Sequence, residues 1–180
     1  MEKRSNNITI RSFSECDISK KVEIINNSSN NKFLHYDLPL QYEKTLSWFN
    51  KIKDNNNRLD LTILLDNTIV GFIGLLGIDN INKKAEYYIC VDSQFNGKGI
   101  GTTSSLLLLD YAFNELSLEK VYLFTEEQNI KAQHLFEKIG FVKEGLLRND
   151  IIYNNRIINR FSYSILKGEY NERNTNSKNK

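Results

Sequence analysis

A stretch in the middle of the chain, residues 86–101, joins a short apolar strand to a glycine-rich loop, and an apolar helical segment follows directly. Gly97, Gly99 and Gly101 alternate with larger residues, which removes three side chains between the strand and the helix. Backbone N–H groups in such a loop can approach a ligand closely, and the first N–H groups of a helix have no internal partner. Because the helix dipole adds partial positive charge at this point, the stretch is predicted to bind a diphosphate group.

Composition limits the class of protein. The chain has 180 residues, of which 40% are hydrophobic and 26% charged, as is typical of one soluble globular domain. Its net charge of +2 gives no reason to propose nucleic acid or a membrane as a partner, and apolar runs such as 106–109 are too short to span a bilayer. The polar N-terminus is not typical of a secretory signal, and the two separated cysteines predict neither disulfides nor a metal site. We therefore expect a cytoplasmic protein with reduced thiols and no metal.

The hydrophobic periodicity predicts mixed α and β structure in a single domain covering residues 1–168. The predicted strands cover residues 7–13, 59–65, 69–78, 85–91, 119–126, 141–147 and 157–166. The predicted helices cover residues 14–25, 40–52, 102–115 and 129–140. Residues 169–180 contain almost no apolar side chains, so they are predicted to be a disordered tail.

Two common phosphate-binding motifs fit the glycine loop poorly. A P-loop requires Ser or Thr directly after its Gly-Lys pair, whereas Lys98 is followed by Gly99. A dinucleotide fingerprint requires Gly-x-Gly-x-x-Gly early in a βαβ unit, whereas the spacing here is Gly-x-Gly-x-Gly and the loop follows strands that look antiparallel.

Two stretches, the glycine loop and a segment further along the chain, match known sequence patterns. Gln94-Phe-Asn-Gly-Lys-Gly99 matches the pattern Gln/Arg-x-x-Gly-x-Gly, and residues 129–141 resemble a second signature, Asn-x-x-Ala-x-x-Leu-Tyr-x-x-x-Gly-Phe. Together the two motifs resemble those of the GNAT N-acetyltransferases. The order of predicted elements is also similar over residues 7–167. The resemblance implies the α/β (α+β) GNAT fold, with a central mixed, mostly antiparallel twisted sheet, helices on both faces and a splayed strand pair that binds acetyl-CoA.

The resemblance also implies which residues bind acetyl-CoA. The Val91 backbone N–H would polarise the thioester carbonyl, and the N–H groups of residues 96–102 would hold the diphosphate. Family members often have Arg where Asn96 stands, and Lys98 could supply the missing cation. Asn129 matches an Asn that contacts the pantetheine arm, but a helix N-cap explains it equally well. The implied cofactor-binding residues are Val91, Gln94, Asn96, Gly97, Lys98, Gly99, Ile100, Gly101, Thr102 and Asn129.

The catalytic groups are less well specified. The usual proton donor of the family, the Tyr of the second motif, is replaced by Phe136, and a Glu that some members use as base corresponds to Phe124. Solvent could protonate the departing CoA thiolate, which is a fairly good leaving group. Glu86 is the best candidate for a base that takes the amine proton through water. A surface carboxylate at a strand end explains Glu86 slightly better.

The acceptor site in this fold is bordered by the link between the first two helices and by the last two strands. That link contains His35, Tyr36 and Asp37, although a lone surface His is more often a bystander. Tyr87 and Tyr88 alternate across the sheet, so one should face the cleft and the other the core. The expected substrate-binding residues are His35, Tyr36, Asp37 and Tyr88.

The expected reaction is acetyl transfer from acetyl-CoA to a primary amine of a small molecule by direct attack in a ternary complex. The last strands resemble the subgroup of ribosomal-protein, polyamine and amino-sugar acetyltransferases. A polyamine site should contain many carboxylates, and only Asp37, Glu43 and Glu86 are candidates here. An amino-sugar nucleotide is therefore preferred slightly over a polyamine, and a protein N-terminus comes third. A catalytically weak acyl-CoA sensor or interaction module is the alternative, and a homodimer is possible because relatives often pair through edge strands.

Overall fold

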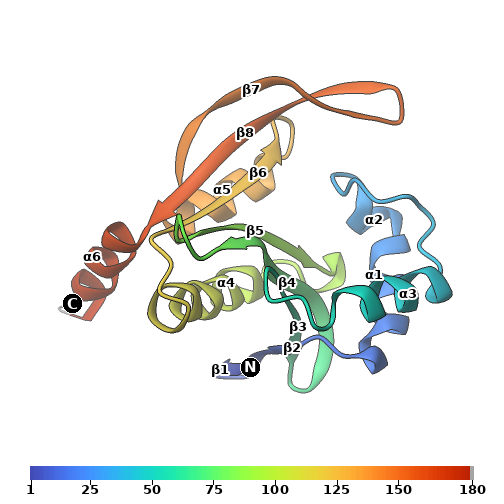
Figure 1. Ribbon diagram of the computed structural model, residues 1–180, viewed down its shortest axis with the longest axis horizontal. Coiled ribbons are helices and arrows are strands. Elements are labelled where there is room, and N and C mark those ends of the chain that lie inside the picture. Colours follow the sequence, from blue (N-terminus) through green and yellow to red (C-terminus); the bar gives the residue numbers. More distant parts are fainter. Residues whose placement is uncertain (179–180) are drawn as a thin grey trace. The chain divides into compact units, whose positions relative to one another are not determined.

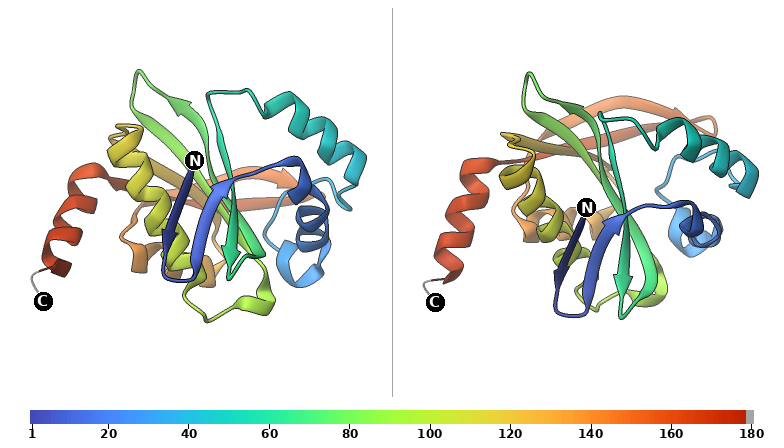
Figure 2. Two further views of the ribbon diagram at one scale, coloured as in Figure 1. Left: turned by 90° about the horizontal axis from the view of Figure 1, so that it is seen from below. Right: turned by 60° about the horizontal axis from the view of Figure 1, so that its bottom comes forward.

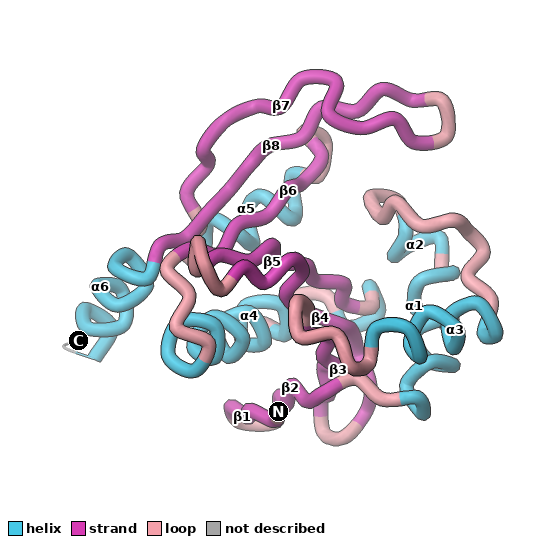
Figure 3. Tube along the Cα trace, in the orientation of Figure 1, coloured by secondary structure: helices cyan, strands magenta, loops and turns pink. Residues whose placement is uncertain are grey.

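The computed structural model describes residues 1–178, and its elements form a mixed α/β fold (Figure 1). The strands form one sheet in the order β1-β2-β3-β4-β5-β6-β8-β7, in which β5 and β6 pair in parallel (Figure 3). The strands are β1 Glu2–Ser5, β2 Ile8–Ser12, β3 Leu59–Leu65, β4 Thr68–Asp79, β5 Lys84–Val91, β6 Lys120–Glu126, β7 Val142–Tyr153 and β8 Arg156–Leu166. The helices are η1 Glu15–Asp17, α1 Ile18–Asn26, α2 Ser28–Asn31, α3 Tyr42–Ile52, η2 Ser93–Phe95, α4 Ile100–Asp110, η3 Tyr111–Glu115, α5 Ile130–Ile139 and α6 Lys167–Lys178.

The chain forms two compact units. The first unit contains Met1–Leu76 and Tyr88–Leu108, and the second contains Gly77–Tyr87 and the described residues from Leu109 onward. In the first unit, helices α1, α2 and α3 lie together on one side of strands β2 to β4, and α4 lies on the other side (Figures 1 and 2).

The core of the first unit follows from the periodicity of its elements. Strand β2 alternates buried and partly exposed residues, so Ile8 and Ile10 point inward. Helix α1 buries Ile18, Ile24 and Ile25 along one face. The Phe13 ring joins these elements, because it packs edge-on against Trp48 and Phe49 of α3 and against Phe72 of β4, with ring centroids 5.9, 5.7 and 5.7 Å apart.

A buried carboxylate, Asp17, anchors the start of α1. Both of its oxygens accept hydrogen bonds from the Arg11 guanidinium at 2.7 Å, and Oδ2 also accepts from the Thr62 hydroxyl at 2.8 Å and the Ser14 N–H at 3.0 Å. Burial alone would raise the pKa of Asp17, but these hydrogen bonds and the charge of Arg11 outweigh it and lower the pKa below its usual value. The ionised form therefore stabilises the fold.

Asp17→Asn is expected to lower the free energy of unfolding near neutral pH by about 1–3 kcal/mol, because charge-assisted hydrogen bonds to a buried group are lost. A carboxyl group whose folded-state pKa is depressed contributes its stability above its unfolded pKa of about 4, and loses it as the pH falls through the folded value. Urea unfolding at a series of pH values should show the difference between variant and wild type shrinking below about pH 4. Glu15→Gln, an exposed neighbour, is the control. A difference that stays constant with pH would contradict the prediction.

The second unit packs α5 against its strands through aromatic side chains. The Phe136 ring lies 6.0 Å from Tyr87, 5.9 Å from Phe141 and 6.3 Å from Tyr163, measured between ring centroids. Helix α5 ends at Gly140, which adopts a left-handed conformation with φ of 118°. The predicted cap at Gly140 is confirmed.

Several predicted boundaries differ from the structure. Strand β1 was not predicted, and β7 extends to Tyr153 rather than ending at residue 147. The predicted disorder from residue 169 is wrong for residues 169–178, which belong to helix α6. The physical reason is one apolar anchor, Tyr170, which is buried and packs on Phe113 with ring centroids 5.2 Å apart. Residues 179–180 lie outside the described part of the chain, and the single-domain assignment stays a prediction.

Candidate functional site

The glycine loop follows β5 through the short helix η2, and α4 begins at Ile100. Gly97 and Gly99 have φ values of 79° and 73°, a region that L-residues rarely adopt, and a Cβ placed at either one would point into open space. The loop backbone is therefore accessible to a ligand at the start of α4, and the buried Ile100 fixes that start in the core. Among the other predicted loop residues, the Lys98 ammonium lies 5.1 Å from the Phe95 ring centroid. This geometry fits a diphosphate group.

Two polar side chains hold the start of the loop in place. The buried Asp92 carboxylate accepts hydrogen bonds from the Gln94 N–H at 3.2 Å and from the Asn30 amide at 3.3 Å. The Asn30 side chain also accepts from the Ser93 N–H at 2.8 Å and donates to the Ile24 carbonyl at 3.0 Å. The loop is thereby tied to α1 and α2, and neither Asn30 nor Asp92 was found from the sequence.

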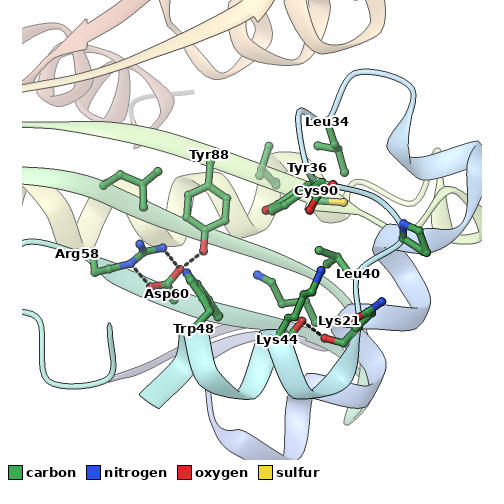
Figure 4. Close-up of a pocket in the computed structure, with 16 residues that line it drawn as sticks. Lys21, Leu34, Tyr36, Leu40, Lys44, Trp48, Arg58, Asp60, Tyr88 and Cys90 are labelled. Carbon is green, nitrogen blue, oxygen red and sulfur yellow. Dashed lines mark hydrogen bonds and ion pairs between the residues drawn. The ribbon is translucent and has the colours of Figure 1, made fainter. Parts of the chain in front are cut away.

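A cavity of about 490 Å³ lies in the first unit (Figure 4). Its walls come from α1, the link between α2 and α3, α3, the start of β3, β4 and β5. Such a volume is typical of a site for a small molecule. Its aromatic and charged lining consists of Tyr36, Trp48, Tyr88, Lys21, Lys44, Arg58, Asp37 and Asp60.

The Asp60 carboxylate accepts hydrogen bonds from two other residues that line the cavity. The donors are Arg58 Nε at 2.6 Å and Nη2 at 2.9 Å, and the Tyr88 hydroxyl at 2.7 Å. Figure 4 shows both donors directed at Asp60. Burial, reinforced by the negative charge of Asp60, raises the pKa of Tyr88 well above its usual value. The phenol therefore stays protonated and serves as a donor.

Lys21 lies on the buried face of α1, and its side chain lines the cavity. The residue is 5% exposed, and its Nζ lies 4.8, 5.0 and 5.3 Å from the ring centroids of Trp48, Phe72 and Phe13. Burial lowers the pKa of the Lys21 ammonium, and the nearby charge of Asp60 only partly opposes this. Cation–π contacts of this kind stabilise a cation but leave its N–H groups without hydrogen-bond acceptors.

Three of the four predicted acceptor-site residues line the cavity. Tyr36, Asp37 and Tyr88 line the cavity, whereas His35 is exposed and is not among the described residues that form its wall. Tyr88 faces the cavity and Tyr87 belongs to the core of the second unit, which answers the question that strand alternation left open. The roles of these residues in binding stay predictions.

Three further predicted positions lie in the second unit. Glu86 is half-buried, and burial raises its pKa while the charge of Arg160 opposes the shift. The Asn129 side-chain oxygen accepts a hydrogen bond from the Ala132 N–H at 3.3 Å, so Asn129 is the N-cap of α5. Phe136 is a packed core residue that has no proton to donate. Catalytic and pantetheine-binding roles at these positions stay predictions.

Two sequence signals could have pointed to the missed residues. Lys21 stands three residues after Ile18 and four before Ile25, so it interrupts the apolar stripe of its helix. Asp60 interrupts an otherwise apolar strand start between Leu59 and Leu61. A charge at a position of apolar periodicity is a sign of a buried polar site.

Two other properties bear on the class of protein. Among residues 1–178, no group of three or more His, Cys, Asp and Glu side chains is arranged to hold a metal ion. No helix of this described part is both long and apolar enough to cross a membrane.

The chain is similar to known acetyltransferases. The family model of the acetyltransferase (GNAT) domain matches residues 7–142. The spermidine N(1)-acetyltransferase of Vibrio cholerae is 30% identical over 165 residues, which cover 91% of this chain and 95% of that protein. YdaF of Bacillus subtilis, provisionally named as a ribosomal N-acetyltransferase, is 32% identical over 176 residues, which cover 93% and 96%.

Solved structures agree with this assignment. The crystal structure of the Vibrio cholerae spermidine N-acetyltransferase in complex with CoA and spermine has a TM-score of 0.85 and 27% identity, covering 92% of this chain and 99% of that one. The predicted fold is confirmed. The glycine loop, the second motif and the sheet that carries them therefore place this chain in the GNAT family, and it is an acyl-CoA-dependent N-acetyltransferase.

Proposed function

We propose that this chain transfers the acetyl group of acetyl-CoA to a primary amine of a small molecule, by direct attack while both substrates are bound. The observation that carries this proposal is the position of the cavity. Tyr88, Ile89 and Cys90 of β5 form part of its wall, and the same strand continues through η2 into the glycine loop. A cofactor whose diphosphate lies on residues 96–102 can run along the end of β5 and present its thioester beside the cavity.

The proposed chemistry uses backbone and solvent more than side chains. The Val91 N–H would stabilise the oxyanion that forms on attack, and solvent would protonate the CoA thiolate because Phe136 has no hydroxyl. Burial raises the pKa of the Cys90 thiol to about 11, so this thiol stays protonated and is a poor nucleophile. This supports direct attack by the amine rather than an acyl-cysteine intermediate.

Glu86 is the proposed base, and burial raises its pKa, which makes its carboxylate a stronger base than an exposed one. Glu86→Gln is expected to lower kcat by about 100-fold or more, while acetyl-CoA affinity stays unchanged. The carboxylate form is the active one, so wild-type kcat should fall as the pH drops through the pKa of Glu86, and the variant should lose this acid limb. Glu119→Gln, an exposed carboxylate of the same unit, is the control. An unaltered rate and pH profile would remove Glu86 from the mechanism.

Different observations favour two acceptor classes. A polyamine is supported by the relatives, because the Vibrio cholerae enzyme is named a spermidine acetyltransferase and its crystal structure contains spermine. An amino-sugar nucleotide is supported by the cavity itself, which combines three aromatic side chains with three cationic ones. Aromatic faces stack on sugars and bases, and cations attract phosphate.

A direct experiment tests the function. Acetyl-CoA affinity is measured by titration, and thiol release is then followed over a panel that contains spermidine, an amino-sugar nucleotide and a peptide with a free N-terminus. Release with at least one small amine is expected. Tight acetyl-CoA binding without release on any amine would favour a sensor, and release on the peptide alone would favour a protein N-terminal acetyltransferase.

A further inference from the structure

The charged side chains in the buried part of the cavity wall do not all neutralise one another. Arg58 and Asp60 neutralise each other through two hydrogen bonds, and the Asp60 carboxylate is further engaged by Tyr88. Asp37 and Lys44 are both exposed, where solvent screens them. Lys21 remains as the buried cation of this wall, and no carboxylate among the described residues forms an ion pair or hydrogen bond with it.

A buried ammonium that no carboxylate contacts directly is costly, and a bound anion can contact it. Three rings surround the Lys21 head group, and the side chain borders the cavity, where a ligand could reach it (Figure 4). The rings exclude water and lower the local dielectric, so an anion placed there gains charge-assisted hydrogen bonds that are stronger than in solvent. A polycation would instead face the like charge of Lys21. It would not find a free buried carboxylate to bind, because Asp60 already accepts hydrogen bonds from Arg58 and Tyr88.

We propose that Lys21 determines the acceptor specificity of this cavity by selecting a primary amine that also carries an anionic group, a carboxylate or a phosphate. This inference rests on the proposed function, because it assumes that the acceptor occupies the cavity. It predicts that this chain prefers anionic amines over polyamines such as spermidine, after which its Vibrio cholerae relative is named.

The first test uses the wild-type chain and pairs of amines that differ only in the anion. 4-Aminobutyrate is compared with butylamine, and glucosamine 6-phosphate with glucosamine, while spermidine represents the polycations. We expect kcat/KM to be about 10- to 100-fold higher for an anionic member than for its neutral partner, as a hydrogen bond to a charged group implies. The pair with the larger ratio identifies carboxylate or phosphate as the anion. A kcat/KM for spermidine above that of every anionic amine would overturn the inference.

The second test removes the charge while keeping the length of the side chain. Lys21→Met should abolish the preference for the anionic amine through KM rather than kcat, and should improve spermidine as an acceptor. Lys21→Gln retains a polar head group and serves as a second variant if Lys21→Met is unstable, and Lys44→Met, at an exposed position of the same cavity, should have a smaller effect. Thermal melting and acetyl-CoA affinity confirm that each variant is folded.

The outcomes separate this inference from the proposed function. An unchanged anionic preference in Lys21→Met would overturn the role of Lys21. An equal fall of kcat on all amines, with a shifted pH profile and unchanged KM, would also overturn it, because Lys21 would then act in proton transfer. If acetyl-CoA binds but no amine is acetylated, the proposed function itself is wrong.

Discussion

Gly99→Val is expected to weaken acetyl-CoA binding by about 100-fold or more while the chain remains folded. Gly99 has φ of 73°, where an L-residue costs about 1–2 kcal/mol and a β-branched one more. The new side chain would also project into the open space beside the loop, where the diphosphate is proposed to lie. Each charge-assisted hydrogen bond lost there costs about a further 1.5–3 kcal/mol. Isothermal titration with acetyl-CoA measures the change.

Gly77→Val is the matched control, because it separates backbone strain from ligand contact. Gly77 has φ of 56° and also faces open space, but it lies in the second unit and outside the loop. The control should lose a similar amount of stability in urea unfolding and keep its affinity for acetyl-CoA. Equal losses of affinity in both variants would show that strain, rather than the proposed diphosphate site, causes the effect.

Asp60→Ala is expected to lower the free energy of unfolding by about 2–3 kcal/mol, because its carboxylate makes charge-assisted hydrogen bonds in a partly buried ion pair and the partners left behind lose them. The Asp60 side chain is 7% exposed, and its loss would deprive Arg58 of two hydrogen bonds and the Tyr88 hydroxyl of one. The hydrogen bond to Asp60 is the main cause that raises the pKa of Arg58, but the guanidinium would stay charged without it, because Arg is not deprotonated in proteins. Urea unfolding near neutral pH measures the loss.

Lys21 provides a further check on the electrostatic part of this effect. The charge of Asp60 acts on Lys21, so Asp60→Ala leaves the buried Lys21 and the partly buried Arg58 facing one cavity without that carboxylate. Lys21→Met in the Asp60→Ala background should recover about 1 kcal/mol or more, which a double-mutant cycle reports as coupling. Glu23→Ala removes an exposed ion pair with Lys20 and should cost less than about 1 kcal/mol. Additive effects of the Lys21 and Asp60 substitutions would contradict the predicted coupling.

Local features were predicted well because their causes are local. Asn129 and Gly140 lie at the two ends of α5, as expected. The Asn side chain accepts the hydrogen bond of a helix N-cap, and a glycine tolerates the left-handed conformation at a helix end. The tail shows where local reasoning fails. Its low apolar content suggested disorder, but Tyr170 packs on Phe113, which lies 57 positions away in the chain, and Arg173 donates a hydrogen bond to the Lys138 carbonyl. No local pattern reveals these contacts.

The sequence by itself determined the glycine loop, the family and the alternation of the main strands. Spacing of glycines and apolar residues specifies backbone conformation and the faces of each element, and the proposed cofactor site follows from these local features. Only the tertiary structure revealed the cavity at which the acceptor is proposed to bind. Lys21, Trp48, Asp60 and Tyr88 come from four separate elements and meet at one cavity. Periodicity indicates that a side chain is buried, whereas the neighbours that surround it, and hence the charge that a substrate meets, depend on how those elements pack.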